Sequence, residues 1–172
     1  SLVGSEMCIR DRLQCADVQD GLRISQDTIR LIASACDAVR PDLVVFSGNQ
    51  IAGYEKVFAK TFQRRRWQES SNISASDKKQ LVDKVHEFVA KLMKPLEDRS
   101  IPWVVTYGNH DFQCGLSNEE LDKIYQDFPC CMNRSASNAS SASAMQSTKC
   151  VLPKQIIFTC EPGTFALPVM DE

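Results

Sequence analysis

Residues Pro41–Gln50 of this 172-residue chain read "PDLVVFSGNQ". Pro41 stops the helical pattern before it, because proline cannot donate the backbone hydrogen bond that a helix interior requires. The run Leu43–Ser47 is rich in β-branched and aromatic residues, which is typical of a strand covered on both faces. Polar residues 48–50 follow at once. The stretch therefore predicts a buried strand with a polar loop at its carboxyl end.

Two further stretches repeat this arrangement of a short strand followed by polar residues. Residues Arg12–Asp17 alternate apolar positions as a strand does, and "DVQD" runs on from Asp17. Residues Ile101–Tyr107 are again largely apolar, and "GNHD" follows them. In an open α/β sheet, ligands sit beyond the carboxyl ends of the strands. The three polar clusters are therefore predicted to lie together at one edge of a sheet.

Helical spacing between these strands predicts the crossovers of a mostly parallel sheet. Ser25 is expected to cap a first helix, and Ser76 a long one that Pro95 bends or shortens. Ser117 and Glu120 form a capping-box pattern for a last helix. The remaining expected elements are a helix at 54–67 and two late strands at 154–160 and 164–169. The order indicates an α/β fold.

Composition excludes several classes of function. A net charge of −2 gives no electrostatic case for nucleic acid or a membrane surface. The apolar runs are far too short to span a bilayer. Eight cysteines are scattered without a C-x-x-C pair, so we expect reduced, partly buried thiols, among them Cys114. The compartment stays open, with the cytoplasm favoured.

The tetrapeptide "GNHD" at residues 108–111 combines groups suited to phosphate or metal chemistry. Asn109 offers an amide oxygen to a hard cation and an amide N–H to a phosphate. His110 can ligate a metal or exchange a proton near neutral pH, and Asp111 can hold the imidazole in one tautomer. An ordinary turn with a solvated histidine is the alternative for so short a motif.

The stretches "PDLVVFSGN" and "VVTYGNHD", in this order and each at a strand end, resemble the calcineurin-like metallophosphoesterase family. The resemblance is nearest to bacterial members of its purple-acid-phosphatase-like branch. It implies a two-sheet β-sandwich flanked by helices (αββα), with mostly parallel strands and helical crossovers. It also implies hydrolysis of a phosphate mono- or diester by two divalent metal ions, which could be Mn, Fe, Zn or Mg.

The resemblance assigns roles residue by residue. Asp17, Gln19, Asn49 and Asn109 fall on the family's metal-ligand positions. Asn109 and His110 would contact the substrate phosphate, with His110 stabilising the phosphoryl group or protonating the leaving oxygen. Asp111 would orient the ring of His110.

Two departures from the family pattern limit what these residues can do. Asn49 stands where the family has an aspartate that bridges the metals, and a neutral amide is a poor bridge between two cations. It is either a loss of that aspartate or a sequence error. The family's further histidines have no counterpart before Glu172, since the other histidine, His86, lies on the long predicted helix beside its apolar stripe.

We therefore expect residues 12–172 to be a partial, inactive metallophosphoesterase domain with a flexible Ser/Ala-rich loop at 134–148. Residues 1–11 resemble a translated sequencing adapter and are expected to be an artefactual or disordered tail. Two alternatives remain. One is a non-catalytic pseudoenzyme that binds a phosphate or a partner, and the other is a generic α/β domain.

Overall fold

The computed structural model describes residues 12–15, 18, 22–65, 73–133 and 158–166. The predicted tail at 1–11 and the predicted loop at 134–148 lie outside these residues, so both stay predictions. The elements in chain order are β1 (Arg12–Cys15), α1 (Gln26–Val39), β2 (Leu43–Ser47), η1 (Lys56–Phe58), α2 (Ala75–Glu97), β3 (Trp103–Thr106), η2 (Asp111–Cys114), α3 (Asn118–Gln126), β4 (Phe158–Glu161) and β5 (Thr164–Ala166).

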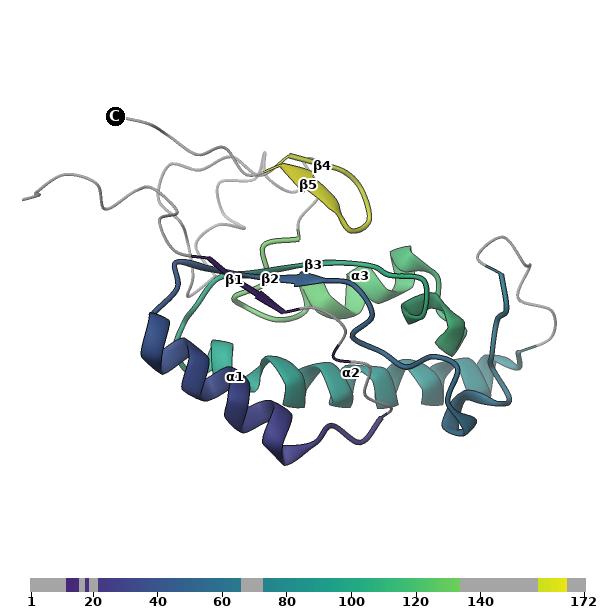
Figure 1. The fold of residues 1–172 in the computed structure, drawn as a ribbon. Coiled ribbons are helices and arrows are strands. Elements are labelled where there is room, and N and C mark those ends of the chain that lie inside the picture. The colour runs from purple at the N-terminus through teal and green to yellow at the C-terminus, as the bar shows by residue number, and fades with distance from the viewer. Residues whose placement is uncertain (1–11, 16–17, 19–21, 66–72, 134–157, 167–172) are drawn as a thin grey trace, which may run out of the picture.

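Strands β1, β2 and β3 form a parallel sheet in that order, with Phe46 opposite both Cys15 and Val105. Helix α1 connects β1 to β2, and α2 connects β2 to β3, as Figure 1 shows. The predicted α/β fold with parallel strands and helical crossovers is confirmed for this part of the chain. Strands β4 and β5 pair separately as an antiparallel hairpin on the opposite side of the sheet from α1 and α2 (Figure 1).

The alternation of side chains along the strands gives the sheet two apolar faces. Val44 and Phe46 point to one core with Trp103 and Val105, and buried residues of α1, α2 and α3 fill this core. On the other face, a smaller cluster gathers Leu43, Val45, Val104 and Met132. The prediction that the second strand is covered on both faces is therefore confirmed.

The helices begin and end close to where the sequence predicts. The Ser25 hydroxyl caps α1, and Ser117 and Glu120 make both bonds of a capping box on α3. The long helix α2 begins two residues earlier than expected, because the Ser74 hydroxyl, rather than that of Ser76, accepts the N–H of Asp77. The structure therefore corrects the cap residue of α2.

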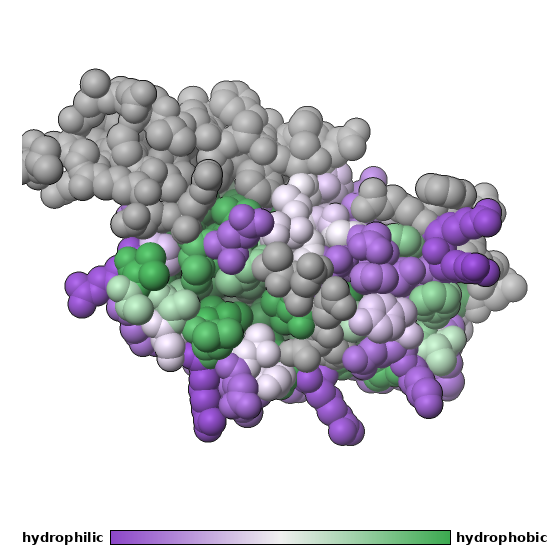
Figure 2. Space-filling model, in the orientation of Figure 1, coloured by the Kyte–Doolittle hydropathy of each residue, from purple (hydrophilic) through white to green (hydrophobic). Residues whose placement is uncertain are grey.

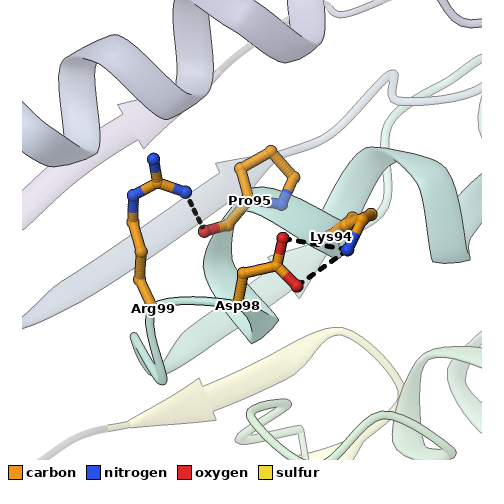
Figure 3. Close-up of polar contacts among 4 residues, drawn as sticks. All are labelled: Lys94, Pro95, Asp98 and Arg99. Atoms are coloured by element: carbon orange, nitrogen blue, oxygen red, sulfur yellow. Dashed lines mark hydrogen bonds and ion pairs between the residues drawn. The ribbon is translucent and has the colours of Figure 1, made fainter.

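Pro95 lies inside the last turn of α2 and does not end the helix, which runs on to Glu97. Figure 3 shows the contacts that hold this turn. Lys94 Nζ lies 2.8 Å from Asp98 Oδ1, and Arg99 Nη1 donates to the carbonyl oxygen of Pro95 at 2.9 Å. These cationic groups bind near the negative end of the helix dipole, where they are most favourable.

The prediction of a helix at residues 54–67 is wrong. Only the short 3₁₀ turn η1 forms there, and the chain then runs irregularly as far as Arg65. Contacts with the loop after β3 replace the helical ladder. The Thr61 hydroxyl donates to the Cys114 carbonyl oxygen at 2.6 Å, and the Gln63 N–H donates to the Gln113 carbonyl oxygen at 3.0 Å. Tertiary contacts here outweigh local helix propensity.

The expectation of reduced thiols is wrong at Cys130, which is disulfide-bonded. Cys15, Cys36, Cys114 and Cys131 are free thiols, as expected. Spacing along the chain could not reveal this difference, because a disulfide depends on which cysteines the fold brings together.

Apolar atoms gather on the surface over β1 and α1, as Figure 2 shows. Leu31 of α1 is 71% exposed there and lines a cavity of about 390 Å³ together with Leu13 and Ala35. None of the helices within the described ranges combines the length and the hydropathy that a bilayer-crossing helix needs.

Strand β3 pairs with β2 along one edge, and the segment Cys130–Asn133 covers its opposite edge. The Met132 N–H donates to the Trp103 carbonyl oxygen at 2.8 Å, which continues the sheet without a named strand. Next to Met132, the side chain of Asn133 makes the hydrogen bonds to β3 that the backbone of a neighbouring strand would otherwise make. Its Oδ1 accepts the N–H of Val105 at 2.8 Å, and its Nδ2 donates to the Val105 carbonyl oxygen at 2.7 Å. Asn133 is only 2% exposed, so water does not supply these bonds.

We predict that Asn133→Leu lowers the free energy of unfolding by roughly 2 kcal/mol or more, because it leaves two buried backbone groups of Val105 without partners. Urea denaturation of the 172-residue protein measures the loss. Asn118→Leu is the matched control, since the buried Oδ1 of Asn118 has no hydrogen-bond partner. Equal losses in the two variants would contradict the prediction.

Candidate active site

The loops that leave β2 and β3 meet at the carboxyl edge of the sheet. Gly48 and Asn49 take positive φ angles of 101° and 55°, which glycine and asparagine tolerate best. Across from them, a Cβ on Gly108 would lie 2.1 Å from the Asn49 Oδ1. Only glycine at position 108 therefore lets the Asn49 side chain cross to the second loop.

A single buried carboxylate ties the two loops together. Asp111, which is 1% exposed, accepts the N–H groups of Asn49 and Gly108 on its Oδ2, both at 2.7 Å. Its Oδ1 accepts the N–H of Ile51 at 2.9 Å. Burial raises the pKa of the Asp111 carboxyl, and these backbone donors oppose the rise without cancelling it.

These contacts correct the position expected for Asp111. The sequence suggested that its carboxylate orients the ring of His110, but the carboxylate bonds to backbone N–H groups of both loops. Asp111 lies in the short helix η2, which turns its side chain back beneath the loops. It therefore acts on His110 only through the backbone that it holds.

The side chains of Asn49, Asn109 and His110 come together above this carboxylate. Asn49 Nδ2 lies 3.2 Å from Asn109 Oδ1, and Asn109 Nδ2 lies 3.3 Å from His110 Nε2. The backbone N–H of His110 donates to Asn49 Oδ1 at 3.0 Å. Asn109 is exposed and His110 is half-buried, so both are accessible to a ligand.

Two residues that the sequence analysis did not single out hold the ring of His110. Gln113 Oε1 lies 2.8 Å from His110 Nδ1, and the ring of Tyr54 meets the imidazole edge-on with the ring centroids 4.8 Å apart. Gln113 follows His110 by three residues in "HDFQ", a spacing at which side chains of a helical turn meet. That spacing was the signal by which the sequence could have revealed Gln113. The sequence holds no such signal for Tyr54, because Tyr54 comes from the other loop.

Gln50 is fully buried beside Asn49, and neither polar atom of its side chain has a hydrogen-bond partner. An unpaired buried amide costs about 1–3 kcal/mol. Both polar atoms of the Gln50 side chain are unpaired, whereas Asn118 and Tyr125 each have one such atom. Gln50 adds a second neutral amide to the loop after β2.

Of the remaining predicted residues, the structure describes His86 and Cys114. Asp17 and Gln19 fall outside the described residues, so their expected ligand roles stay predictions. His86 lies on α2, stacked on Phe128 and facing Asp127, as the sequence placed it on a helix surface. Cys114 is fully buried, and burial raises the pKa of its thiol to about 12, so it is the inert loop thiol expected.

The described residues do not fit a pair of metal ions. Within the described ranges, no three His, Cys, Asp or Glu side chains are grouped as a metal site requires. The Oδ1 atoms of Asn49 and Asn109 already accept hydrogen bonds, and both side chains are neutral. Two neighbouring cations need anionic ligands between them, and these amides supply no charge.

The parallel sheet thus places the polar loop that contains Gly-Asn-His-Asp at its carboxyl edge, beside the loop that follows β2. The chain belongs to the calcineurin-like phosphoesterase family, whose model matches residues 12–163. It is also similar to the phosphatase DCR2 of Saccharomyces cerevisiae, with 24% identity over 127 residues. That match covers 74% of this chain and 17% of the yeast protein, so the chain spans less than a fifth of that relative's length. No solved structure matches the chain significantly.

We predict that Asp111→Asn lowers the free energy of unfolding by about 2 kcal/mol. The amide nitrogen that replaces one carboxylate oxygen can only donate, so it cannot accept a hydrogen bond from the backbone N–H that it faces. Urea denaturation measures the loss. Asp83→Asn is the control, since Asp83 is an exposed residue of α2. A loss no larger than that of the control would show that the carboxylate does not hold the loops.

Proposed function

We propose that this chain forms part of a hydrolase that cleaves phosphate mono- or diesters, and that Asn109 and His110 contact the phosphoryl group. The observation that carries the proposal is the contact between the Asn109 amide and the His110 ring at the carboxyl edge of the sheet. Membership in the phosphoesterase family and the similarity to a yeast phosphatase support it.

The chemistry of the two side chains suits a phosphate ester. The Asn109 amide can donate a hydrogen bond to a non-bridging phosphoryl oxygen. The His110 imidazole can exchange a proton with an ester oxygen or with water near neutral pH. Asp111 keeps both on one rigid turn through its bonds to the backbone of Asn49, Ile51 and Gly108. Such preorganisation limits what must be ordered when a substrate binds.

Within the family, we place the chain nearest the purple-acid-phosphatase-like branch, on the strength of "PDLVVFSGN" and "VVTYGNHD". The two divalent metal ions of that family would belong to the full-length parent, with Asp17 and Gln19 as further candidate ligands. The described residues give no independent support for them.

A second candidate function is non-catalytic binding of a phosphate group. The observation that favours it is Asn49, whose amide engages both Asn109 and His110 where the family has a bridging aspartate. A neutral cluster can still donate hydrogen bonds to phosphate oxygens. It lacks the charge that stabilises a phosphoryl group during transfer.

We predict that Asn49→Asp raises manganese-dependent hydrolysis of para-nitrophenyl phosphate by the 172-residue protein on the order of tenfold or more, because it supplies an anionic ligand. His110→Ala and Asn109→Ala in that background should each remove the gain. His86→Ala is the matched control, since it removes the other histidine and should leave hydrolysis unchanged.

Binding of inorganic phosphate, followed by calorimetry on the same variants, separates the two functions. Phosphate binding that depends on Asn109 and His110, with no hydrolysis before or after Asn49→Asp, supports the non-catalytic function. If neither hydrolysis nor phosphate binding depends on these residues, both are wrong.

A further inference from the structure

Four hydrogen bonds join the two loops and return to the ring of His110. The His110 backbone N–H lies 3.0 Å from Asn49 Oδ1, and Asn49 Nδ2 lies 3.2 Å from Asn109 Oδ1. Asn109 Nδ2 then lies 3.3 Å from His110 Nε2, and His110 Nδ1 lies 2.8 Å from Gln113 Oε1. We refer to these four contacts as the amide chain.

The amide chain has a fixed direction because it starts at a backbone N–H, which can only donate. The atom of Asn49 that accepts from it must be oxygen, so the other end of that amide donates to Asn109. The same reasoning makes Asn109 an acceptor toward Asn49 and a donor toward His110. His110 Nε2 must therefore accept, and a neutral imidazole that accepts at Nε2 carries its proton on Nδ1. Gln113 Oε1 is the matching acceptor for that proton.

We propose that Asn49 and Gln113 are positioning residues that hold neutral His110 in the Nδ1–H tautomer, with an unprotonated Nε2 beside Asn109. The catalytic consequence of this tautomer rests on the proposed function, whereas the tautomer itself can be measured without it. Of the two roles considered for His110, the resting ring takes a proton at Nε2 and has none there to give to a leaving oxygen. The proton on Nδ1 stays hydrogen-bonded to Gln113.

The surroundings of Gln113 show that its contact with the ring is built into the fold. The Gln113 N–H donates to the His110 carbonyl oxygen at 3.1 Å, and its own carbonyl oxygen accepts the N–H of Gln63 at 3.0 Å. A Cβ on Gly53 would lie 2.4 Å from the His110 carbonyl oxygen, so only glycine fits against this turn. Tyr54 packs against the ring edge-on, at an interplanar angle of 72°.

Asp111 cannot orient the ring in place of Gln113, because three backbone N–H groups already occupy its carboxylate. A glutamine differs from a carboxylate in this position because it is neutral. It fixes the tautomer by hydrogen bonding alone and does not add a charge that favours the imidazolium form.

The experiment is a long-range ¹H–¹⁵N correlation spectrum of the labelled 172-residue protein, recorded in the pH range where the ring nitrogen shifts of both histidines no longer change as the pH rises. The chain has two histidines, so His86 serves as an internal reference. We expect His110 to hold the Nδ1–H tautomer in roughly tenfold excess, as two additional oriented hydrogen bonds allow. A spectrum with Nε2–H as the main tautomer of His110 would overturn the proposal.

Substitutions at Gln113 test its part in the amide chain. Gln113→Glu keeps an acceptor and should retain the Nδ1–H tautomer, whereas Gln113→Leu should reduce its excess by about tenfold. Gln126→Leu is the matched control, because Gln126 lies on α3 and donates to Asp122. Equal tautomer ratios in Gln113→Leu and Gln126→Leu would refute the role of Gln113.

Asn49→Asp tests the direction of the amide chain and does not depend on whether Gln113→Leu folds. A carboxylate at position 49 only accepts, so Asn109 must turn its amide N–H toward it and its oxygen toward His110. We expect the tautomer ratio to shift toward Nε2–H by about tenfold. An unchanged ratio would show that residue 49 does not set the direction. The spectra report the resting protein, so the tautomer can be established even if hydrolysis is absent.

Discussion

The carboxylate of Asp111 is the constraint on which the arrangement at the sheet edge depends. It accepts the backbone N–H groups of Asn49 and Ile51 from one loop and of Gly108 from the other. Loops after parallel strands have no ladder to hold them together, so each would otherwise find its own conformation. One buried acceptor replaces that missing ladder. Glycines at 48, 53 and 108 then allow the backbones to approach closely enough to share it.

The backbone that this carboxylate holds also sets the orientations of the side chains above it. Because the backbone N–H of His110 has a fixed direction, it selects the orientation of the Asn49 amide, and each following amide selects the next. The ring of His110 is thus held through its own backbone as well as by Gln113 and Tyr54. A short motif gains its geometry from a second loop about 60 residues earlier in the chain.

The sequence predicted the sheet well, because apolar strands, Ser25 and the capping box of Ser117 and Glu120 are local signals. It also predicted that the polar loops after the second and third strands meet. It failed where long-range contacts decide the outcome. Thr61 bonds to the loop after β3, so the expected helix there does not form. The partners of Asp111 and His110 were likewise beyond local reasoning, because a chain pattern does not say which loop supplies them.

The exchange of a carboxylate for an amide at position 49 changes what the site needs in order to be stable. An aspartate there would lie beside Asp111, whose N–H donors come partly from residue 49 itself, and two close carboxylates repel unless cations separate them. An asparagine carries no charge, and it satisfies its neighbours by donating to Asn109 and accepting from His110. Among the described residues, hydrogen bonds of the Asn49 side chain therefore join the two loops. A neutral amide at this position adds no negative charge that would attract a cation.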